Sequence, residues 1–291
     1  MNGIILINKN KGCTSHDIVY KVKKMLNEKV GHTGTLDPMA TGVLPLLIGK
    51  GTLCSKYLIN HDKTYKVKLQ LGSKTETADA EGKVIEEKEV GESTFNENNV
   101  LEVLKCFVGK QKQVPPIYSA IKVNGKKLYE YARSGQNIEI QPREIEIYNI
   151  NLIQVEKDAK QIDFEVSCSK GTYIRSLCED IATKLGTVGF MTELQRIQVG
   201  EFNIKDTISV EELEKELEQE NKLHKNYFIS LEKLFENKES IELNNKKLQL
   251  FLNGVKLSME LSNDIYKVYN TGKFIGIGIV ENNLLKRDII L

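Results

Sequence analysis

One short segment of the chain combines a carboxylate with residue types that fix a loop. Residues 31–45 read GHTGTLDPMATGVLP and hold Asp37 among three glycines, with Pro38 directly after it. Glycine reaches backbone conformations that other residues cannot adopt, and it lets a ligand approach the main chain closely. Pro38 biases Asp37 toward an extended backbone and stiffens the loop. These residue types would suit a loop that presents one carboxylate to a ligand.

Two other interpretations of this segment have to be weighed. Asp-Pro turns are common, and the local pattern by itself favours a purely structural turn. A phosphate-binding loop is excluded. Residues 49–52 read GKGT, with glycine where GxxxxGK[ST] requires serine or threonine, and residue 44 is leucine where the first glycine should stand.

The elements that position this loop follow from the spacing of apolar residues. A strand is predicted at 3–7, followed by a helix that opens at Thr14, where Thr14 and Asp17 fit a capping box. Residues 65–71 alternate strictly, which predicts a half-buried strand with Tyr65 on its apolar face. Further predictions are a helix near 100–108 closed by Gly109, a strand at 162–168 and a helix at 174–185.

The order of these elements indicates the fold class. Strands and helices do not alternate regularly, which predicts an α+β fold with a central, largely antiparallel or mixed sheet flanked by helices. Residues 113–143 contain two adjacent prolines, several lysines and several tyrosines, and are expected to protrude. From about residue 237, short strand-like runs and Asn-Gly and Thr-Gly turn signals predict a small β module. We therefore expect a large domain at 1–230 and a small one at 237–291.

Composition narrows the class of protein. The 291 residues are 40% hydrophobic and 28% charged, with a formal net charge of +1 and five cysteines without C-x-x-C spacing. This is globular composition with reduced thiols, as expected for a cytoplasmic protein. No signal peptide and no apolar run of roughly 18 residues is visible, so no membrane association is expected. The four histidines are scattered, and no metal site is predicted.

The loop around Asp37 resembles the signature loop of the bacterial tRNA pseudouridine-55 synthase family. Four more segments are similar to the family and stand in its order, over about residues 1–205. They are residues 9–15, 62–65 (DKTY), 116–133 (from PIYSAIK to LYEYAR) and 168–175 (CSKGTYIR). Five ordered motifs outweigh the structural-turn interpretation of Asp37. The resemblance implies a pseudouridine-synthase-type catalytic domain, with a thumb at about 113–143 that grips RNA and a PUA-like RNA-binding module at the C-terminus.

The resemblance also implies roles for individual residues. Asp37 looks like the catalytic nucleophile, Arg175 like its salt-bridge partner and Tyr65 like the aromatic that stacks on the target base. Substrate contacts are implied at four further positions: His32, Tyr173, the base-pocket residue Leu194, and Lys126 in the thumb. Two departures from the family pattern, Lys9-Asn10 for Lys-Pro and Leu194-Gln195-Arg196 for Leu-Arg-Arg, concern the grip on RNA rather than the chemistry.

Elementary chemistry agrees with these roles, although each residue type also occurs in a purely structural role. A dry pocket raises a carboxylate's pKa, and a guanidinium within about 4–6 Å lowers it again. Moving the target base out of its stack costs a few kcal/mol, and stacking of that base on one tyrosine can offset much of this cost. Without the resemblance, Arg175 would be expected to form a structural ion pair and Tyr65 to pack in the core. His32 would be expected to serve as a hydrogen-bonded spacer. The reaction is an isomerisation without redox change, so no cofactor is expected.

The implied substrate is tRNA, recognised at the T stem-loop. Lysines cluster near the N-terminus and around the thumb, which could attract phosphates although the total charge cancels, while acidic residues gather at 211–220. We expect a monomer that needs no obligatory protein partner. Two alternatives are a non-catalytic tRNA-binding folding factor, which would not need Asp37, Tyr65 and Arg175 together, and a relative guided to another RNA by partners.

Overall fold

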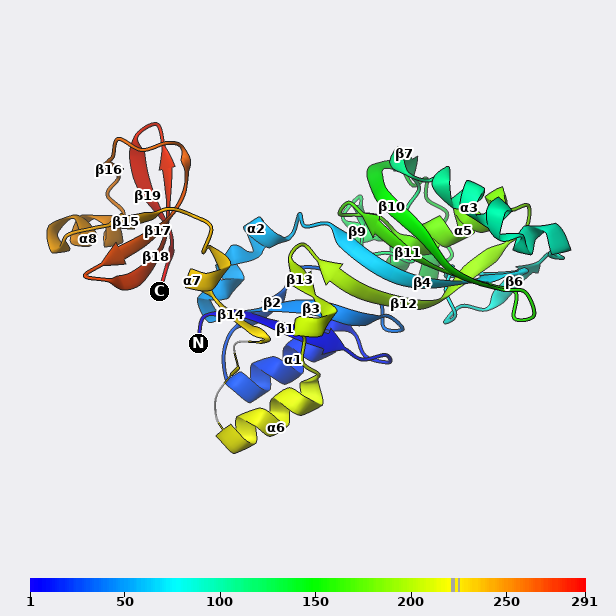
Figure 1. Cartoon of the computed structure of the whole chain (residues 1–291), viewed down its shortest axis with the longest axis horizontal. Coiled ribbons are helices and arrows are strands. Elements are labelled where there is room, and N and C mark those ends of the chain that lie inside the picture. Colours follow the sequence, from blue (N-terminus) through cyan, green and yellow to red (C-terminus); the bar gives the residue numbers. More distant parts are fainter. Residues whose placement is uncertain (221–222, 225) are drawn as a thin grey trace.

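The computed structural model describes residues 1–220, 223–224 and 226–291, which form two large β-sheets with helices packed on them. Figure 1 shows the larger sheet extending from the N-terminal elements to the right-hand end of the molecule, with the smaller sheet at the left near the C-terminus. The predicted α+β class is confirmed. Within the described residues, no helix is long and apolar enough to cross a membrane.

The larger sheet is mixed but largely antiparallel, as predicted. Its ten strands are β1 (Gly3–Lys9), β2 (Val30–His32), β3 (Thr41–Ile48), β4 (Lys63–Leu71), β7 (Gly109–Gln113), β10 (Arg143–Glu156), β11 (Gln161–Cys168), β12 (Gly189–Val199), β13 (Phe202–Asn203) and β14 (Phe228–Ser230). The main path runs β14-β1-β3-β12-β4-β11-β10-β7, with β2 on β3 and β13 on β12. The pairing of β3 with β12 is parallel. The two halves of the sheet therefore meet where β3 lies beside β12.

The alternation of residues 65–71 produces the expected two-sided strand. In β4, Tyr65, Val67, Leu69 and Leu71 are buried, whereas Lys66 is exposed. The buried side chains belong to one apolar cluster that also includes residues of α1, α5 and β11. Burial of a large aliphatic side chain contributes about 1.5–3 kcal/mol, so this face of the sheet holds the strand in register.

Helices cover the two halves of the sheet separately. They are α1 (Ser15–Leu26), α2 (Ser55–Leu58), α3 (Glu97–Lys105), α5 (Ile174–Lys184), α6 (Val210–Glu220) and α7 (Leu231–Leu234). In Figure 1, α1 and α6 lie side by side below β1, whereas α3 and α5 lie near β10 and β11. Thr14 caps α1 through the predicted capping box with Asp17. The predicted end of α3 is wrong, because the helix is capped at Cys106 and Gly109, with a φ of 109°, begins β7.

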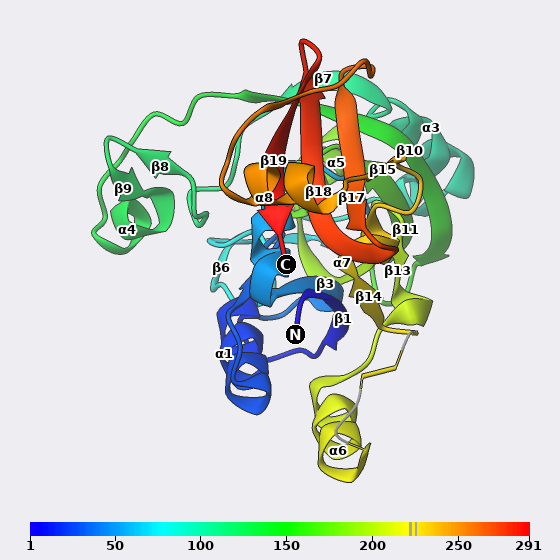
Figure 2. The same cartoon turned by 90° about the vertical axis from the view of Figure 1, so that its left-hand side faces the viewer.

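The segment predicted to protrude does project from the body of the molecule, as Figure 2 shows at the left. It contains the short strands β8 (Lys122–Val123) and β9 (Lys126–Lys127), followed by α4 (Leu128–Arg133). Asn124 and Gly125 form the turn between the strands with φ values of 51° and 83°. Positive φ at both positions is what a tight hairpin turn requires. A second small hairpin is formed by β5 (Ser73–Thr75) and β6 (Val84–Glu87).

The predicted C-terminal β module is present as a five-stranded sheet with its own apolar cluster. Its elements are β15 (Ser240–Glu242), α8 (Asn245–Leu252), β16 (Leu257–Ser258), β17 (Asp264–Asn270), β18 (Lys273–Glu281) and β19 (Leu284–Ile290). Asp288 accepts a hydrogen bond from the Tyr57 hydroxyl and forms an ion pair with Lys56. These contacts, together with Ile277 and Ile289 in a shared apolar cluster, join the module to the N-terminal part.

Candidate active site

The loop that carries Asp37 connects β2 with β3 and is held by buried polar groups. The Ser15 hydroxyl accepts a hydrogen bond from the Leu36 amide at 2.8 Å and donates one to its carbonyl at 3.1 Å. Lys9 donates to the carbonyls of Pro38 and Ala40 at 3.2 and 2.6 Å. Lys9 is fully buried, so it is not part of the phosphate-attracting lysine cluster that was expected near the N-terminus. Its ammonium group instead fixes the backbone that follows Asp37.

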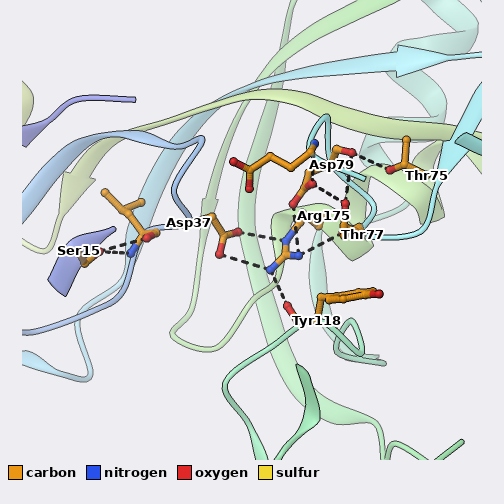
Figure 3. Close-up of polar contacts among 9 residues, drawn as sticks. Ser15, Asp37, Thr75, Thr77, Asp79, Tyr118 and Arg175 are labelled. Carbon is orange, nitrogen blue, oxygen red and sulfur yellow. Dashed lines mark hydrogen bonds and ion pairs between the residues drawn. The ribbon is translucent and has the colours of Figure 1, made fainter. Parts of the chain in front are cut away.

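Arg175 binds Asp37 through one edge of the guanidinium group, formed by Nε and Nη2. Its Nε lies 3.1 Å from Asp37 Oδ2, and its Nη2 lies 3.4 Å from Oδ1, as Figure 3 shows. Arg175 stands in the first turn of α5, and its side chain is 8% exposed, against 34% for Asp37. Bidentate pairs of this kind fix orientation as well as charge. The carboxylate is thus held by one side, with its other surface open.

A second carboxylate, Asp79, binds the same guanidinium group. Arg175 Nη1 lies 3.4 Å from Asp79 Oδ2, and the carbonyls of Thr77 and Tyr118 accept from Nη1 and Nη2 at 3.1 and 3.0 Å. Asp79 Oδ1 in turn accepts from the Thr77 hydroxyl at 2.6 Å (Figure 3). Asp79 was not among the residues predicted from the sequence. It is one of three acidic residues within residues 76–81, and nothing in the local pattern distinguishes it from the others.

Burial and nearby charges set the pKa of Asp37 in opposite directions. Burial raises the pKa of this carboxyl above its ordinary value, and Arg175 lowers it, while Asp79 raises it and Lys9 lowers it by smaller amounts. The net direction is upward. The guanidinium therefore acts as the sequence analysis expects, but it only partly offsets the loss of solvent.

Asp37 and Arg175 lie in a cleft of about 820 Å³. This size falls in the range of ligand sites in proteins. Six of the seven predicted site residues line it, namely His32, Asp37, Tyr65, Tyr173, Arg175 and Leu194. Lys126 does not line the cleft. It lies on β9, with its ammonium group 5.8 Å from the centre of the Tyr131 ring.

Tyr65 and Leu194 come from neighbouring strands of the sheet. Tyr65 is 8% exposed on β4, and β12 runs antiparallel beside it, with Leu194 opposite Val67. Burial raises the pKa of the Tyr65 hydroxyl, which is therefore neutral at physiological pH. Because two strands fix these side chains, the cleft has a rigid apolar wall next to the carboxylate.

The other two predicted substrate contacts, Tyr173 and His32, also line the cleft. The main chain of Tyr173 is clamped by the Gln113 side chain, which accepts from its amide at 2.8 Å and donates to its carbonyl at 3.0 Å. His32 ends β2, and burial lowers its pKa, so the imidazole is neutral near pH 7. Its buried Nδ1 has no hydrogen-bond partner among the described residues, contrary to a hydrogen-bonded spacer.

Several cations that were not predicted as site residues also line the cleft. They are Lys63, Arg143, Lys170 and Arg196. Their presence gives the cleft a positive character suited to a polyanion. Among the described residues, no group of three histidine, cysteine, aspartate or glutamate side chains could hold a metal ion.

Comparisons with known proteins agree with this geometry. Residues 22–174 match the family described as "TruB family pseudouridylate synthase (N terminal domain)", and residues 175–241 match "tRNA pseudouridylate synthase B C-terminal domain". The chain belongs to the TruB family of pseudouridylate synthases. The resemblance drawn from the motifs is confirmed.

Relatives named tRNA pseudouridine synthase B are similar over nearly the whole chain. The protein from Clostridium kluyveri is 44% identical over 96% of this chain and 96% of its own. The protein from Clostridium perfringens strain 13 is 44% identical over 100% of this chain and 99% of its own. The protein from Oceanobacillus iheyensis is 44% identical over 89% and 85%.

Solved structures share the fold at lower identity. A chain of the H/ACA RNP bound to a substrate RNA containing 2′-deoxyuridine superposes with a TM-score of 0.69 at 22% identity, covering 99% of this chain and 85% of that chain. A chain of the Cbf5-Nop10-Gar1 complex superposes with a TM-score of 0.67 at 24% identity, covering 99% of this chain and 83% of that chain. These likenesses confirm the pseudouridine-synthase type of fold.

Proposed function

We propose that this protein isomerises uridine to pseudouridine at position 55 in the T loop of tRNA, with Asp37 as the nucleophile. The observation that carries the proposal is the bidentate pair of Asp37 and Arg175 inside a cleft with Tyr65 on its wall. A carboxylate held on one side by a guanidinium keeps an open surface for a reacting atom. The names of the relatives supply the substrate class.

The reaction conserves atoms and electrons. The bond from ribose C1′ to uracil N1 breaks, a bond from C1′ to C5 forms, C5 loses a proton and N1 gains one. Asp37 supplies the nucleophilic oxygen for an everted nucleotide, and Arg175 favours the ionised form of that carboxylate. The oxidation level of the base does not change, so the chemistry does not call for an electron carrier.

The remaining residues act on the substrate rather than on the bonds that change. The Tyr65 ring stacks on the everted uracil, and Leu194 packs beside it. His32 occupies the space that the base leaves in the RNA, and Tyr173 contacts the nucleotide at the other edge of the cleft. Lys126, on the projecting hairpin, binds phosphate.

The chain divides these tasks between two parts. Residues 1–230 carry out the reaction and hold the thumb at about 113–143, whereas residues 237–291 bind a further part of the tRNA. The protein works in the cytoplasm as a monomer without an obligatory protein partner.

The test incubates purified protein with an unmodified tRNA transcript and maps pseudouridine at each position. We expect one modified site in the T loop and none with Asp37→Asn, which should still bind the transcript. Asp163→Asn is a matched control, because Asp163 is a partly buried carboxyl with a raised pKa that does not line the cleft. Binding by the wild-type protein without modification would instead indicate the non-catalytic folding factor.

A further inference from the structure

The two halves of the large sheet are joined along a short seam. Strand β12 pairs with β3 at two positions, Gln195 opposite Thr41 and Arg196 opposite Gly42. On its other side, β12 pairs with β4, and there Arg196 stands opposite Tyr65. Arg196 therefore lies between β3, which follows the Asp37 loop, and β4, which carries Tyr65.

The Arg196 side chain reaches back across this seam to the Asp37 loop. It is 1% exposed, and its Nε donates to the Val43 carbonyl at 2.8 Å while Nη2 donates to the Gly34 carbonyl at 3.1 Å. Gly34 precedes Asp37 and Val43 follows it. One planar guanidinium group therefore fixes both ends of the loop, which a single ammonium point charge could not do in the same geometry.

Arg196 has an electrostatic environment different from that of Arg175. In the part of the chain that the structure describes, no carboxylate forms an ion pair with it. The Tyr65 hydroxyl lies beside the guanidinium, which opposes the rise of that hydroxyl's pKa on burial. A buried cation costs free energy unless its hydrogen bonds are satisfied. The two loop carbonyls and the Tyr65 hydroxyl are the polar groups that Arg196 is placed to hold.

We propose that Arg196 is a positioning residue for the isomerisation, because it bridges the seam and fixes the Asp37 loop relative to Tyr65. This inference rests on the proposed function and assigns the residue that sets the distance between nucleophile and stacked base. Arg196 does not touch the reacting atoms. Its effect reaches them through the backbone at Gly34 and Val43 and through the Tyr65 ring.

The test compares Arg196→Met and Arg196→Lys with the wild-type protein. The single-turnover rate at saturating enzyme, the Kd for tRNA and the unfolding temperature are measured for each. We expect the rate of Arg196→Met to fall about 10²-fold, the cost of a misplaced reacting group, with Kd close to wild type. Arg196→Lys, which keeps the charge but has one donor nitrogen in place of three, should recover part of the rate. A merely structural role would lower the unfolding temperature and leave the single-turnover rate of the folded protein unchanged.

A second variant disturbs the seam without touching the guanidinium, and a matched control lies far from the cleft in the chain. A Cβ on Gly42 would lie 2.2 Å from the Arg196 carbonyl oxygen, whereas one on Gly91 would meet only the Ser93 hydroxyl at 3.8 Å. Gly42→Ala should therefore slow turnover, and Gly91→Ala should not. A folded Arg196→Met or Gly42→Ala protein with the wild-type single-turnover rate would overturn the inference. A wild-type protein without pseudouridine formation would instead overturn the proposed function.

Discussion

Asp37 and Asp79 bind opposite sides of one guanidinium group, that of Arg175. Asp79 is the more deeply buried, with 5% of its side chain exposed against 34% for Asp37. The buried carboxylate thus anchors the arginine, and the arginine presents its remaining edge to the carboxylate that faces the cleft (Figure 3). Because Asp79 anchors Arg175 and Asp37 faces the cleft, replacing each of the three residues should have a different effect.

Replacement of Arg175 by lysine should slow the chemical step while tRNA binding persists. Lysine keeps the charge but cannot bind two carboxylates and two carbonyls in one plane. We expect the single-turnover rate to fall by about 10²-fold, similar to the loss of one preorganised donor in other active sites. Single-turnover kinetics and filter binding separate the two effects, and a wild-type rate would contradict the ion-pair account.

Asp79→Asn should shift the pH dependence of the reaction. Asp79 raises the pKa of Asp37, so its neutralisation should lower that pKa and move the acidic limb of the rate profile to lower pH. The maximal rate should also fall, because Arg175 loses its buried anchor. Glu76→Gln, an exposed carboxylate close in sequence, is the control and should leave the profile in place. An acidic limb that moves to higher pH in Asp79→Asn would contradict this electrostatic assignment.

Asp37→Asn should not destabilise the fold at neutral pH. The folded-state pKa of Asp37 is raised, so its protonated form contributes stability that is present below the unfolded-state pKa and lost as pH rises through the folded-state value. The asparagine side chain in Asp37→Asn does not ionise, so this loss of stability does not occur in the variant. We expect the unfolding temperature of Asp37→Asn to equal or exceed that of the wild type at pH 7, with the difference shrinking at acidic pH. A large drop in the unfolding temperature of Asp37→Asn at pH 7 would mean that the ion pair with Arg175 stabilises the fold by more than the burial of the charged carboxylate costs.

Tyr65→Leu and Tyr65→Phe should separate stacking from the hydroxyl group. Loss of an aromatic platform costs about 1–3 kcal/mol per stacked base, so Tyr65→Leu should weaken turnover of tRNA strongly. Tyr65→Phe keeps the ring and tests the hydroxyl beside Arg196. Equal kcat/KM for the leucine and wild-type proteins would remove the stacking role.

The sequence by itself determined most of the secondary structure and the family. Period-two alternation at residues 65–71 and the capping box at Thr14 are local signals, and both elements formed as predicted. The α3 boundary was wrong because Gly109 serves a strand rather than a helix end. The mixed character of the sheet was expected, but which strands meet was not.

Only the tertiary structure brings the predicted residues into contact. Asp37 and Arg175 are 138 positions apart in the chain, and Arg196 bonds to carbonyls 153 and 162 positions away. Asp79 carries no local pattern, and the motifs that contain Lys9 and Arg196 do not indicate that both side chains bind loop carbonyls, because these contacts depend on burial and on the fold. Such contacts arise only when distant strands are brought together, and at a sheet seam the geometry is set by the fold rather than by sequence spacing.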